Sequence, residues 1–376
     1  MTRHLRGMAW DHPRGYDPVV ATAREYESRN PDVRISWDRR SLQAFADFPI
    51  GQLADEYDLI VIDHPHVGAV AREGYLVALD EHAPNGALEA LSDQSLGGSH
   101  ESYQYDGRQW ALAIDAAAQV AAYRPDLLSR VPKRWSEVAA LAETGAVLWP
   151  IKPVDALMGF FTLAANRGTP CAENSEHLIE QADGSAVLEA MRAVVRHVPK
   201  ECLKMNPIEA LALMSSASSY AYCPLLYGYS NYARDEFVKY LIKFANIPAL
   251  GNNGPVGSTL GGAGIAVSSS SSHLDAAVDY AYWIASAECQ RGIYFRAGGQ
   301  PANAVAWNDD EVNAASNSYF QDTYETLSNA WLRPRYETYL EFQDEGGELM
   351  NGFLAGRRGV DKTLSLLDRC YRESLR

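Results

Sequence analysis

The sequence lacks the marks of a membrane-inserted or disulfide-stapled protein. No hydrophobic run approaches the ~20 apolar residues that cross a bilayer. The five cysteines form an odd set without the paired spacing of a zinc cluster or a disulfide framework. We therefore expect no membrane insertion, no metal site and free thiols. The cysteines are Cys171, Cys202, Cys223, Cys289 and Cys370.

Positive charge is also scarce. Lys and Arg number 33 against 48 Asp and Glu, so the formal net charge is −15. A negative field repels polyanions, which excludes nucleic-acid binding and attachment to anionic membranes as main functions. Residues 1–10 contain no apolar stretch of the kind that a secretory signal needs. Two localisations stay open: cytoplasmic if Met1 is the native start, and periplasmic or extracellular if a signal was removed and Met1 added.

The chain is long enough for two lobes and rich in aromatic residues that carry a polar group. At about 100–200 residues per domain, 376 residues favour two lobes. A hydrophobic share of 47% and a charged share of 22% suit a globular protein with a substantial core. The sequence contains 21 Tyr and 8 Trp but only 10 Phe, and Tyr and Trp suit amphipathic binding surfaces as well as cores.

The first hundred residues alternate between strand and helix patterns. Asp17-Pro18 is typical of a helix start, and Asn30-Pro31 ends that helix. Residues 33–37 alternate like a half-buried strand, and residues 59–62 are continuously apolar like a strand buried on both faces. A short helix that ends at Gly74 follows. This rhythm predicts an open α/β sheet, whose ligands gather beyond the carboxyl ends of the strands.

The later sequence predicts a second α/β set. Asp155 and Gly168 are the expected cap and stop of a helix around 157–164, and residues 251–255 are a turn-rich boundary. The other expected elements are a strand over 110–115, a helix over 187–195, a helix that starts at 206–207, strands at 220–223, 241–245 and 264–267, a serine loop over 268–272 and a helix over 276–284.

Five segments occur in a characteristic order: residues 57–63, 74–80, 227–232, 261–268 and 298–301. In this order and spacing they resemble family 1 extracellular solute-binding proteins, the maltose-binding-protein-like receptors of bacterial ABC importers. The resemblance covers nearly the whole chain. The absent signal, the absent lipid-attachment cysteine and an unusual acidic-histidine motif depart from the family pattern.

The resemblance implies an α/β, two-lobe periplasmic-binding-protein-like (type II) fold, with hinge strands and an interlobe cleft that closes on a ligand. Lobe one would comprise residues 1–112 and 255–308. Lobe two would comprise residues 116–250 and 309–376, with hinges near 113–115 and 251–254. The implied partners are a small polar ligand and, if the protein is exported, an ABC permease.

An Asp-His-Pro motif occurs twice, within residues 10–13 and 62–65, each time at the end of a predicted strand. The expected strand order makes those strands neighbours, so two carboxylates and two imidazoles would converge. The candidate residues here are Trp10, Asp11, His12, Arg14, Asp63 and His64.

Several interpretations of this pair stay open. The side chains bind the hydroxyls of a polyol, or they hold a divalent metal, although their spacing matches no recognised metal motif. In a third interpretation His12 and His64 act as acid and base, with Asp11 and Asp63 orienting them. Alternatively, Asp and His simply cap the helices that follow.

Further candidates for ligand contact lie elsewhere in the chain. In an extended segment Tyr227 and Tyr229 share one side, and aromatic faces pack on sugar rings, while core filling is the alternative. Near the predicted second-lobe helix, Trp149 is a candidate for stacking, and Lys152 either holds a ligand carboxylate or is a solvated charge. The remaining candidates are Asp115, Asn231 and Gln300.

The glycine-rich residues 261–264 do not form a phosphate cradle, because they precede a strand and no Lys-Ser/Thr follows. They predict a close backbone approach where the chain re-enters lobe one, and we expect no cofactor. Cys223 has apolar neighbours that raise its pKa and favour an inert thiol.

Two functions follow from these patterns. The first is a solute-binding protein, not an enzyme, that captures a sugar or sugar acid by closure of two lobes for ABC-type uptake. The alternative is a cytoplasmic enzyme or metabolite sensor on the same scaffold, which uses the paired Asp-His-Pro motifs as an acid/base or metal site.

Overall fold

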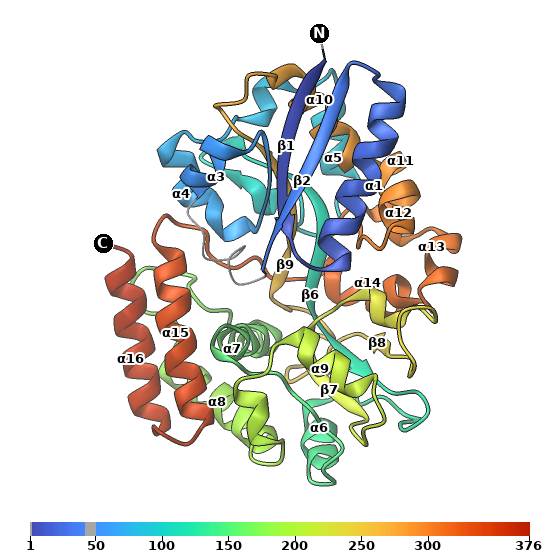
Figure 1. Ribbon diagram of the computed structural model, residues 1–376. Helices are drawn as coiled ribbons and strands as arrows, with labels where there is room; N and C mark the ends of the chain where they lie inside the picture. Colours follow the sequence, from blue (N-terminus) through green and yellow to red (C-terminus); the bar gives the residue numbers. More distant parts are fainter. Residues whose placement is uncertain (1, 42–49) are drawn as a thin grey trace. The chain divides into compact units, whose positions relative to one another are not determined.

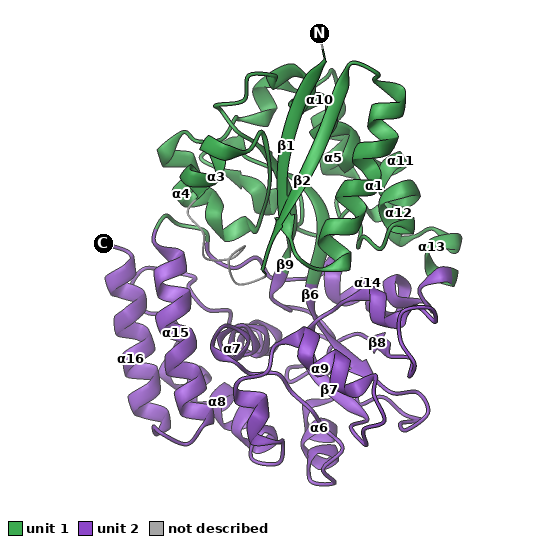
Figure 2. Cartoon of the chain, in the orientation of Figure 1, with its two compact units in different colours: residues 1–117, 261–314, 335–337 green, residues 118–260, 315–334, 338–376 purple. Residues whose placement is uncertain are grey.

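The computed structural model describes residues 2–41 and 50–376; Met1, with which the predicted first lobe begins, lies outside the described residues. The chain divides into two compact units, each assembled from separated segments (Figure 2). Unit 1 comprises residues 1–117, 261–314 and 335–337, and unit 2 comprises residues 118–260, 315–334 and 338–376.

Residues 309–314 and 335–337 thus belong to unit 1 and not with the predicted second lobe. The chain first crosses between the units after residue 117 and again after residue 260. The predicted hinges near 113–115 and 251–254 precede these two crossings. Their action as hinges stays a prediction.

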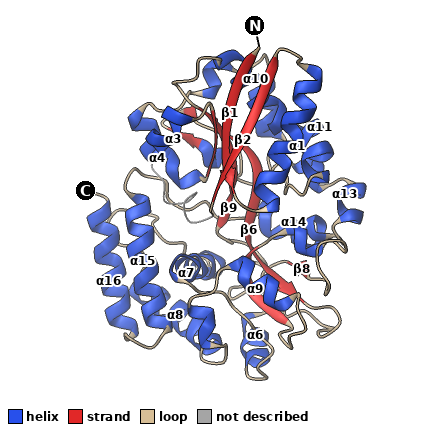
Figure 3. Ribbon diagram, in the orientation of Figure 1, coloured by secondary structure: helices blue, strands red, loops and turns tan. Residues whose placement is uncertain are grey.

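Unit 1 is an α/β unit built on a mixed sheet, in which β2, β1, β3 and β9 lie in that order (Figures 1 and 3). Strand β1 pairs in parallel with β2 and β3, and β9 pairs antiparallel with β3. The strands of unit 1 are β1 (Arg3–Trp10), β2 (Val33–Arg40), β3 (Leu59–Ile62), the short pair β4 (Gln104–Tyr105) and β5 (Arg108–Gln109), the first half of β6 (Leu112–Tyr123) and β9 (Leu260–Val267).

Helices surround this sheet in sequence. They are α1 (Pro13–Arg29), α3 (Ile50–Glu56), η1 (His64–His66), α4 (Val67–Glu73), η2 (Leu79–His82), α5 (Ala87–Asp93), η3 (Glu101–Tyr103), α10 (Leu274–Ala285), α11 (Ala287–Cys289), η6 (Gln290–Tyr294), α12 (Ala304–Trp307) and α13 (Asp310–Ala315), whose last residue belongs to unit 2.

Several local predictions for unit 1 are confirmed. In β2 buried and exposed residues alternate from Val33 to Asp38, and all four residues of β3 are buried. Helix α4 ends at Gly74, whose φ of +69° is the left-handed conformation that glycine adopts without a Cβ penalty. The predicted strand at 110–115 begins at Leu112 instead and continues to Tyr123.

The predicted start of helix α1 was wrong. His12 is the N-cap and Pro13 the first residue, so that Pro18 lies inside the helix. Two proline signals stand in tandem, Asp-His-Pro and Asp-Pro, and the first of them begins the helix. The predicted end is confirmed, with Asn30 as the C-cap.

Unit 2 combines three strands with long helices. The second half of β6 pairs antiparallel with β7 (Tyr222–Tyr227) and β8 (Lys243–Ala245). Helix α7 (Pro153–Arg167) packs against α8 (Gln181–Val195) and α15 (Tyr339–Leu354). The other helices are α6 (Trp135–Ala142), η4 (Lys200–Leu203), α9 (Pro207–Met214), η5 (Ser230–Ala233), α14 (Tyr319–Ser328) and α16 (Val360–Ser374).

The two ends of α7 differ in how well the sequence predicted them. Gly168 is the C-cap, with a left-handed φ of +95°, as expected. Asp155 is not the N-cap, because Lys152 occupies that position and Asp155 lies inside the first turn. Among the described residues, no helix combines the length and apolarity that spanning a membrane requires.

Candidate functional site

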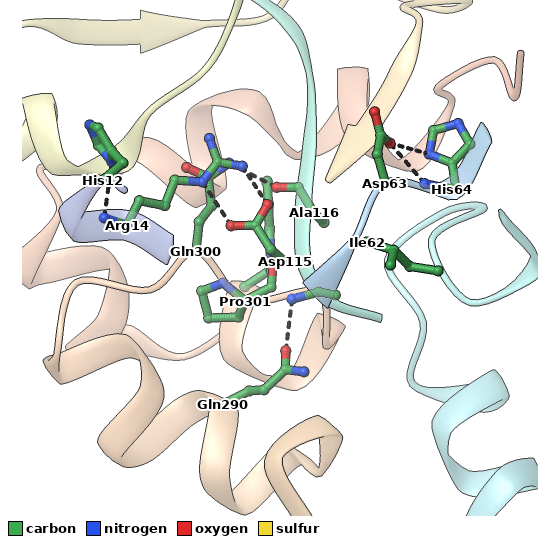
Figure 4. Close-up of polar contacts among 12 residues, drawn as sticks. His12, Arg14, Ile62, Asp63, His64, Asp115, Ala116, Gln290, Gln300 and Pro301 are labelled. Atoms are coloured by element: carbon green, nitrogen blue, oxygen red, sulfur yellow. Dashed lines mark hydrogen bonds and ion pairs between the residues drawn. The ribbon is translucent and has the colours of Figure 1, made fainter. Parts of the chain in front are cut away.

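The two Asp-His-Pro motifs follow neighbouring strands of unit 1. Strand β1 pairs in parallel with β3, with Gly7 opposite Leu59 and Met8 opposite Ile60, as predicted. The carboxyl ends of parallel neighbours lie at the same edge of a sheet, which is where ligands bind in open α/β folds. Figure 4 shows His12 and Asp63, one from each motif, on either side of Asp115.

Arg14 and Asp115 form a buried ion pair at this edge (Figure 4). Arg14 Nε donates to Asp115 Oδ2 at 2.7 Å, and Nη2 donates to Oδ1. The two side chains are 5% and 1% exposed, so water and salt screen the pair little. Burial raises the pKa of Asp115, the Arg14 guanidinium opposes this shift, and Asp63 adds to it. The charge of Arg14 is therefore balanced by a carboxylate within unit 1.

The backbone next to Asp115 is closely packed. Gly262 has a φ of +122°, and an added Cβ there would overlap the carbonyl oxygen of Asp115. Gln300 Nε2 donates to the carbonyl of Ala116 at 2.8 Å, and the Ala116 N–H donates to the Gln300 carbonyl at 3.3 Å. The predicted close approach at residues 261–264 is confirmed. Gln300 is fully buried, and its side chain binds backbone; ligand contact by this residue stays a prediction.

His12 and Asp63 cap the turns that follow them. His12 Nδ1 accepts the N–H of Arg14 at 3.0 Å, and Asp63 Oδ1 accepts the N–H of His64 at 2.8 Å. The capping interpretation is therefore confirmed for these two side chains. His64 is fully buried, with its Nδ1 3.2 Å from Asp63 Oδ1.

Trp10 and Asp11 differ in exposure although they are adjacent. The Trp10 ring is 5% exposed and packs on Gly15 of α1, where an added Cβ would overlap the ring. Asp11 is exposed and pairs with Arg39 of β2 at 3.1 Å. Asp11 thus presents a carboxylate to solvent, whereas Trp10 contributes to the core of unit 1.

The environment of His12 predicts a specific pH dependence of stability. Burial, with help from the Arg14 charge, lowers the pKa of His12 from 6.5 to about 4. Between these two values the unfolded chain binds more protons than the folded chain, so the contribution of His12 is complete above pH 6.5 and lost as the pH falls to about 4. His12→Asn keeps a capping side chain without a titrating group, and we expect a shallower loss of unfolding free energy in this range.

Urea unfolding of both proteins at a series of pH values measures this slope. The control is His4→Asn, since His4 is exposed on β1 and caps no helix. Parallel pH profiles for His12→Asn and the parent would contradict the assignment.

Trp149 lies in the core of unit 2. Its side chain is fully buried and meets Trp135 edge to face, with the ring centroids 5.4 Å apart. Gly159 of α7 packs against the same ring, and an added Cβ there would lie 3.2 Å from it. The predicted stacking of Trp149 on a ligand therefore has no exposed ring face to use.

Two charged residues stand at the start of α7. Lys152 is half-buried, whereas Asp155 is 3% exposed. Burial raises the pKa of Asp155 from 3.8 to about 7; Lys152 lowers it and Glu209 raises it by smaller amounts. The sequence analysis treated Asp155 as a cap and missed it as a functional candidate. The only signal was an acidic residue just before an apolar run, which is also the pattern of an ordinary helix start.

The tyrosine-rich segment continues from the end of β7. Tyr227 is half-buried, while Tyr229 is 7% and Asn231 3% exposed. The backbone of Tyr229 is extended, with φ −125° and ψ 100°. At Gly228 an added Cβ would overlap the hydroxyl of Tyr319, so the segment packs closely on α14. Ligand contact by these residues stays a prediction.

All five cysteines are free and buried. Burial raises the pKa of the Cys223 thiol well above its usual range, which confirms the predicted inert thiol. Within residues 2–41 and 50–376, no group of three or more His, Cys, Asp or Glu side chains is arranged to hold a metal ion.

Two α/β units built from interleaved segments, with polar residues at the carboxyl edge of the first sheet, define a two-lobe binding-protein fold. The sequence profile of the family described as bacterial extracellular solute-binding protein matches residues 21–319. The chain belongs to this family, as the sequence analysis expected.

Solved structures share the fold over the whole chain at low identity. Maltose-bound MalE3 of T. maritima is 17% identical with a TM-score of 0.83, covering 100% of this chain and 99% of that one. A tagatose-bound solute-binding protein of Thermotoga lettingae is 15% identical with a TM-score of 0.83 and full coverage of both chains. A ribitol-bound protein of Agrobacterium radiobacter is 19% identical with a TM-score of 0.78, covering 99% and 98%.

Proposed function

We propose that this protein captures a small carbohydrate, either a sugar or a polyol, and delivers it to an ABC transporter outside the cytoplasm. The observation that carries the proposal is the polar cluster at the carboxyl edge of the unit 1 sheet, where the Arg14–Asp115 pair lies between the two Asp-His-Pro motifs. Such convergent polar groups fix the orientation of hydroxyl-rich ligands. Closure of the two lobes on the ligand is the mechanism that the family resemblance implies.

The similar structures support a carbohydrate ligand. Their bound molecules are maltose, tagatose and ribitol, each of which presents several hydroxyl groups. The roles of His12 and Asp63 favour binding over acid–base chemistry, because both side chains cap turns and the pKa of His12 is lowered to about 4. A histidine with so low a pKa is a poor general base near neutral pH.

Thermal unfolding in the presence of maltose, maltotriose, tagatose, ribitol and galacturonate tests this proposal. A true ligand at about 100 times its Kd stabilises the folded state by about 2.7 kcal/mol, so we expect a clear rise in Tm with at least one neutral compound. Asp63→Asn keeps the capping oxygen but removes the charge, and it should reduce that rise. Asp275→Asn, which changes an exposed carboxylate in the first turn of α10, is the control. Unchanged Tm values across the panel would sink the proposal.

A further inference from the structure

One buried carboxyl group of unit 2 lacks a hydrogen-bond partner. Asp155 is 3% exposed and lies in the first turn of α7. Its Oδ2 atom is buried and accepts no hydrogen bond from the residues that the structure describes. Buried polar groups are nearly always hydrogen-bonded in native proteins, so this atom requires an explanation.

The surroundings of Asp155 do not supply the missing donor. Lys152, at the N-cap of the same helix, favours the ionised form by its charge, and Glu209 of α9 opposes it. Cys223 of β7 also interacts with Asp155, but burial raises the pKa of its thiol, which therefore stays neutral. On the α15 side the residue against this turn is Gly347, which packs on the backbone of α7 and carries no charge.

The helix itself favours a negative charge at this position. The first turn of α7 presents the positive end of the helix dipole, which stabilises a nearby carboxylate by about 0.3–1 kcal/mol. Burial nevertheless outweighs the helix and Lys152, because the pKa of Asp155 is raised to about 7. Half of the molecules therefore carry the proton near neutral pH, in a group that gains from any new hydrogen-bond donor.

A group of this kind is costly for stability. Between pH 3.8 and about 7 the folded chain binds more protons at Asp155 than the unfolded chain does, so folding stability falls as the pH rises through this range. Local conflicts of this sort are expected at functional sites, where a ligand completes the polar network. Residues 152–154 next to it are half-buried, which leaves this edge of the turn within reach of solvent.

We propose that Asp155 is a proton-linked ligand contact in unit 2, whose carboxylate accepts a hydrogen bond from a hydroxyl group of the bound carbohydrate. The inference rests on the proposed carbohydrate-binding function. The protonated carboxyl group releases its proton to solvent, and the ligand O–H then donates to the carboxylate, so no other bond changes. A neutral or cationic ligand fits this contact, whereas the carboxylate of a sugar acid would face a second anion.

Titration calorimetry with the carbohydrate that raises the Tm most is the test. Experiments at about pH 6 and pH 8, in buffers of different ionisation enthalpy, measure both Kd and the protons released. Below pH 7 we expect Kd to weaken by up to about tenfold per pH unit and release to approach one proton per ligand. In Asp155→Asn the amide cannot ionise, so binding should weaken at pH 8, lose its pH dependence and release no proton.

Asp275→Asn is the matched control and should behave like the parent, because this first-turn carboxylate is exposed. A separate measurement does not need a ligand: between pH 4 and 7 the unfolding free energy of the parent should fall relative to that of Asp155→Asn, as the sign of the pKa shift requires. This comparison also shows that the variant folds.

The outcomes separate the two proposals. A ligand that binds the parent with no proton release and a flat Kd overturns the role of Asp155 and leaves the carbohydrate function standing. Proton release that persists in Asp155→Asn assigns the proton to another group, such as Asp115, and overturns it equally. If no carbohydrate binds, the proposed function fails and this inference fails with it.

Discussion

Asp115→Leu should lower the unfolding free energy by about 3–5 kcal/mol, because it leaves the Arg14 guanidinium buried without its counter-ion. Arg14→Met should cost a similar amount, since it strands the carboxylate. The double variant, with Arg14→Met and Asp115→Leu together, should be more stable than either single variant. Replacing both members of a buried ion pair by apolar side chains of similar size is often close to neutral.

Urea unfolding of the parent, the two single variants and the double variant measures this coupling. Asp32→Asn is the control, because the Arg3–Asp32 pair is largely exposed and should contribute less than about 1 kcal/mol. Additive losses in the double variant would show that Arg14 and Asp115 do not depend on each other. The ligand panel applied to the double variant then tells whether the pair also contacts carbohydrate.

The second large effect is expected at Gly262. Gly262→Ala places a side chain on a backbone with φ +122°, where strain costs about 1–3 kcal/mol. The new Cβ also overlaps the carbonyl oxygen of Asp115, and overpacking of this kind adds about 1–3 kcal/mol. We expect a total loss of about 2–6 kcal/mol, and a displaced Asp115 should weaken the Arg14–Asp115 pair as well.

Gly86→Ala separates backbone strain from the overlap. Gly86 also has a positive φ, of +72°, but an added Cβ there has no atom within 4 Å among the described residues. This variant should lose only about 1 kcal/mol. Thermal and urea unfolding measure both variants, and equal losses would contradict the close approach of β9 to the start of β6.

The local elements of the fold were largely predictable from the sequence. The alternation in β2 and the apolar run of β3 are periodic signals that depend on neighbours in the chain. Helix α9 begins after Asn206 as expected, because the Asn206 side chain accepts the N–H of Glu209 at 2.9 Å. Such contacts span only a few residues, so the sequence contains all the groups that make them.

The candidate site was predicted less completely. The sequence located both Asp-His-Pro motifs at one sheet edge, since the resemblance supplied the strand order. It could not distinguish a cap from a ligand contact, because both use the same side-chain oxygen or nitrogen. It also proposed Trp149 as a stacking ring, although packing against Trp135 and Gly159 buries that ring in the core.

The sequence by itself determined the α/β class, the helix and strand signals and the membership in a solute-binding family, because these follow from periodicity and from short motifs in order. Only the tertiary structure decided that Arg14 pairs with Asp115, 101 residues away, and that Asp155 is buried without a hydrogen-bond partner. Charge pairing and burial depend on which distant segments pack together. That information lies in the folded chain and not in any stretch of neighbouring residues.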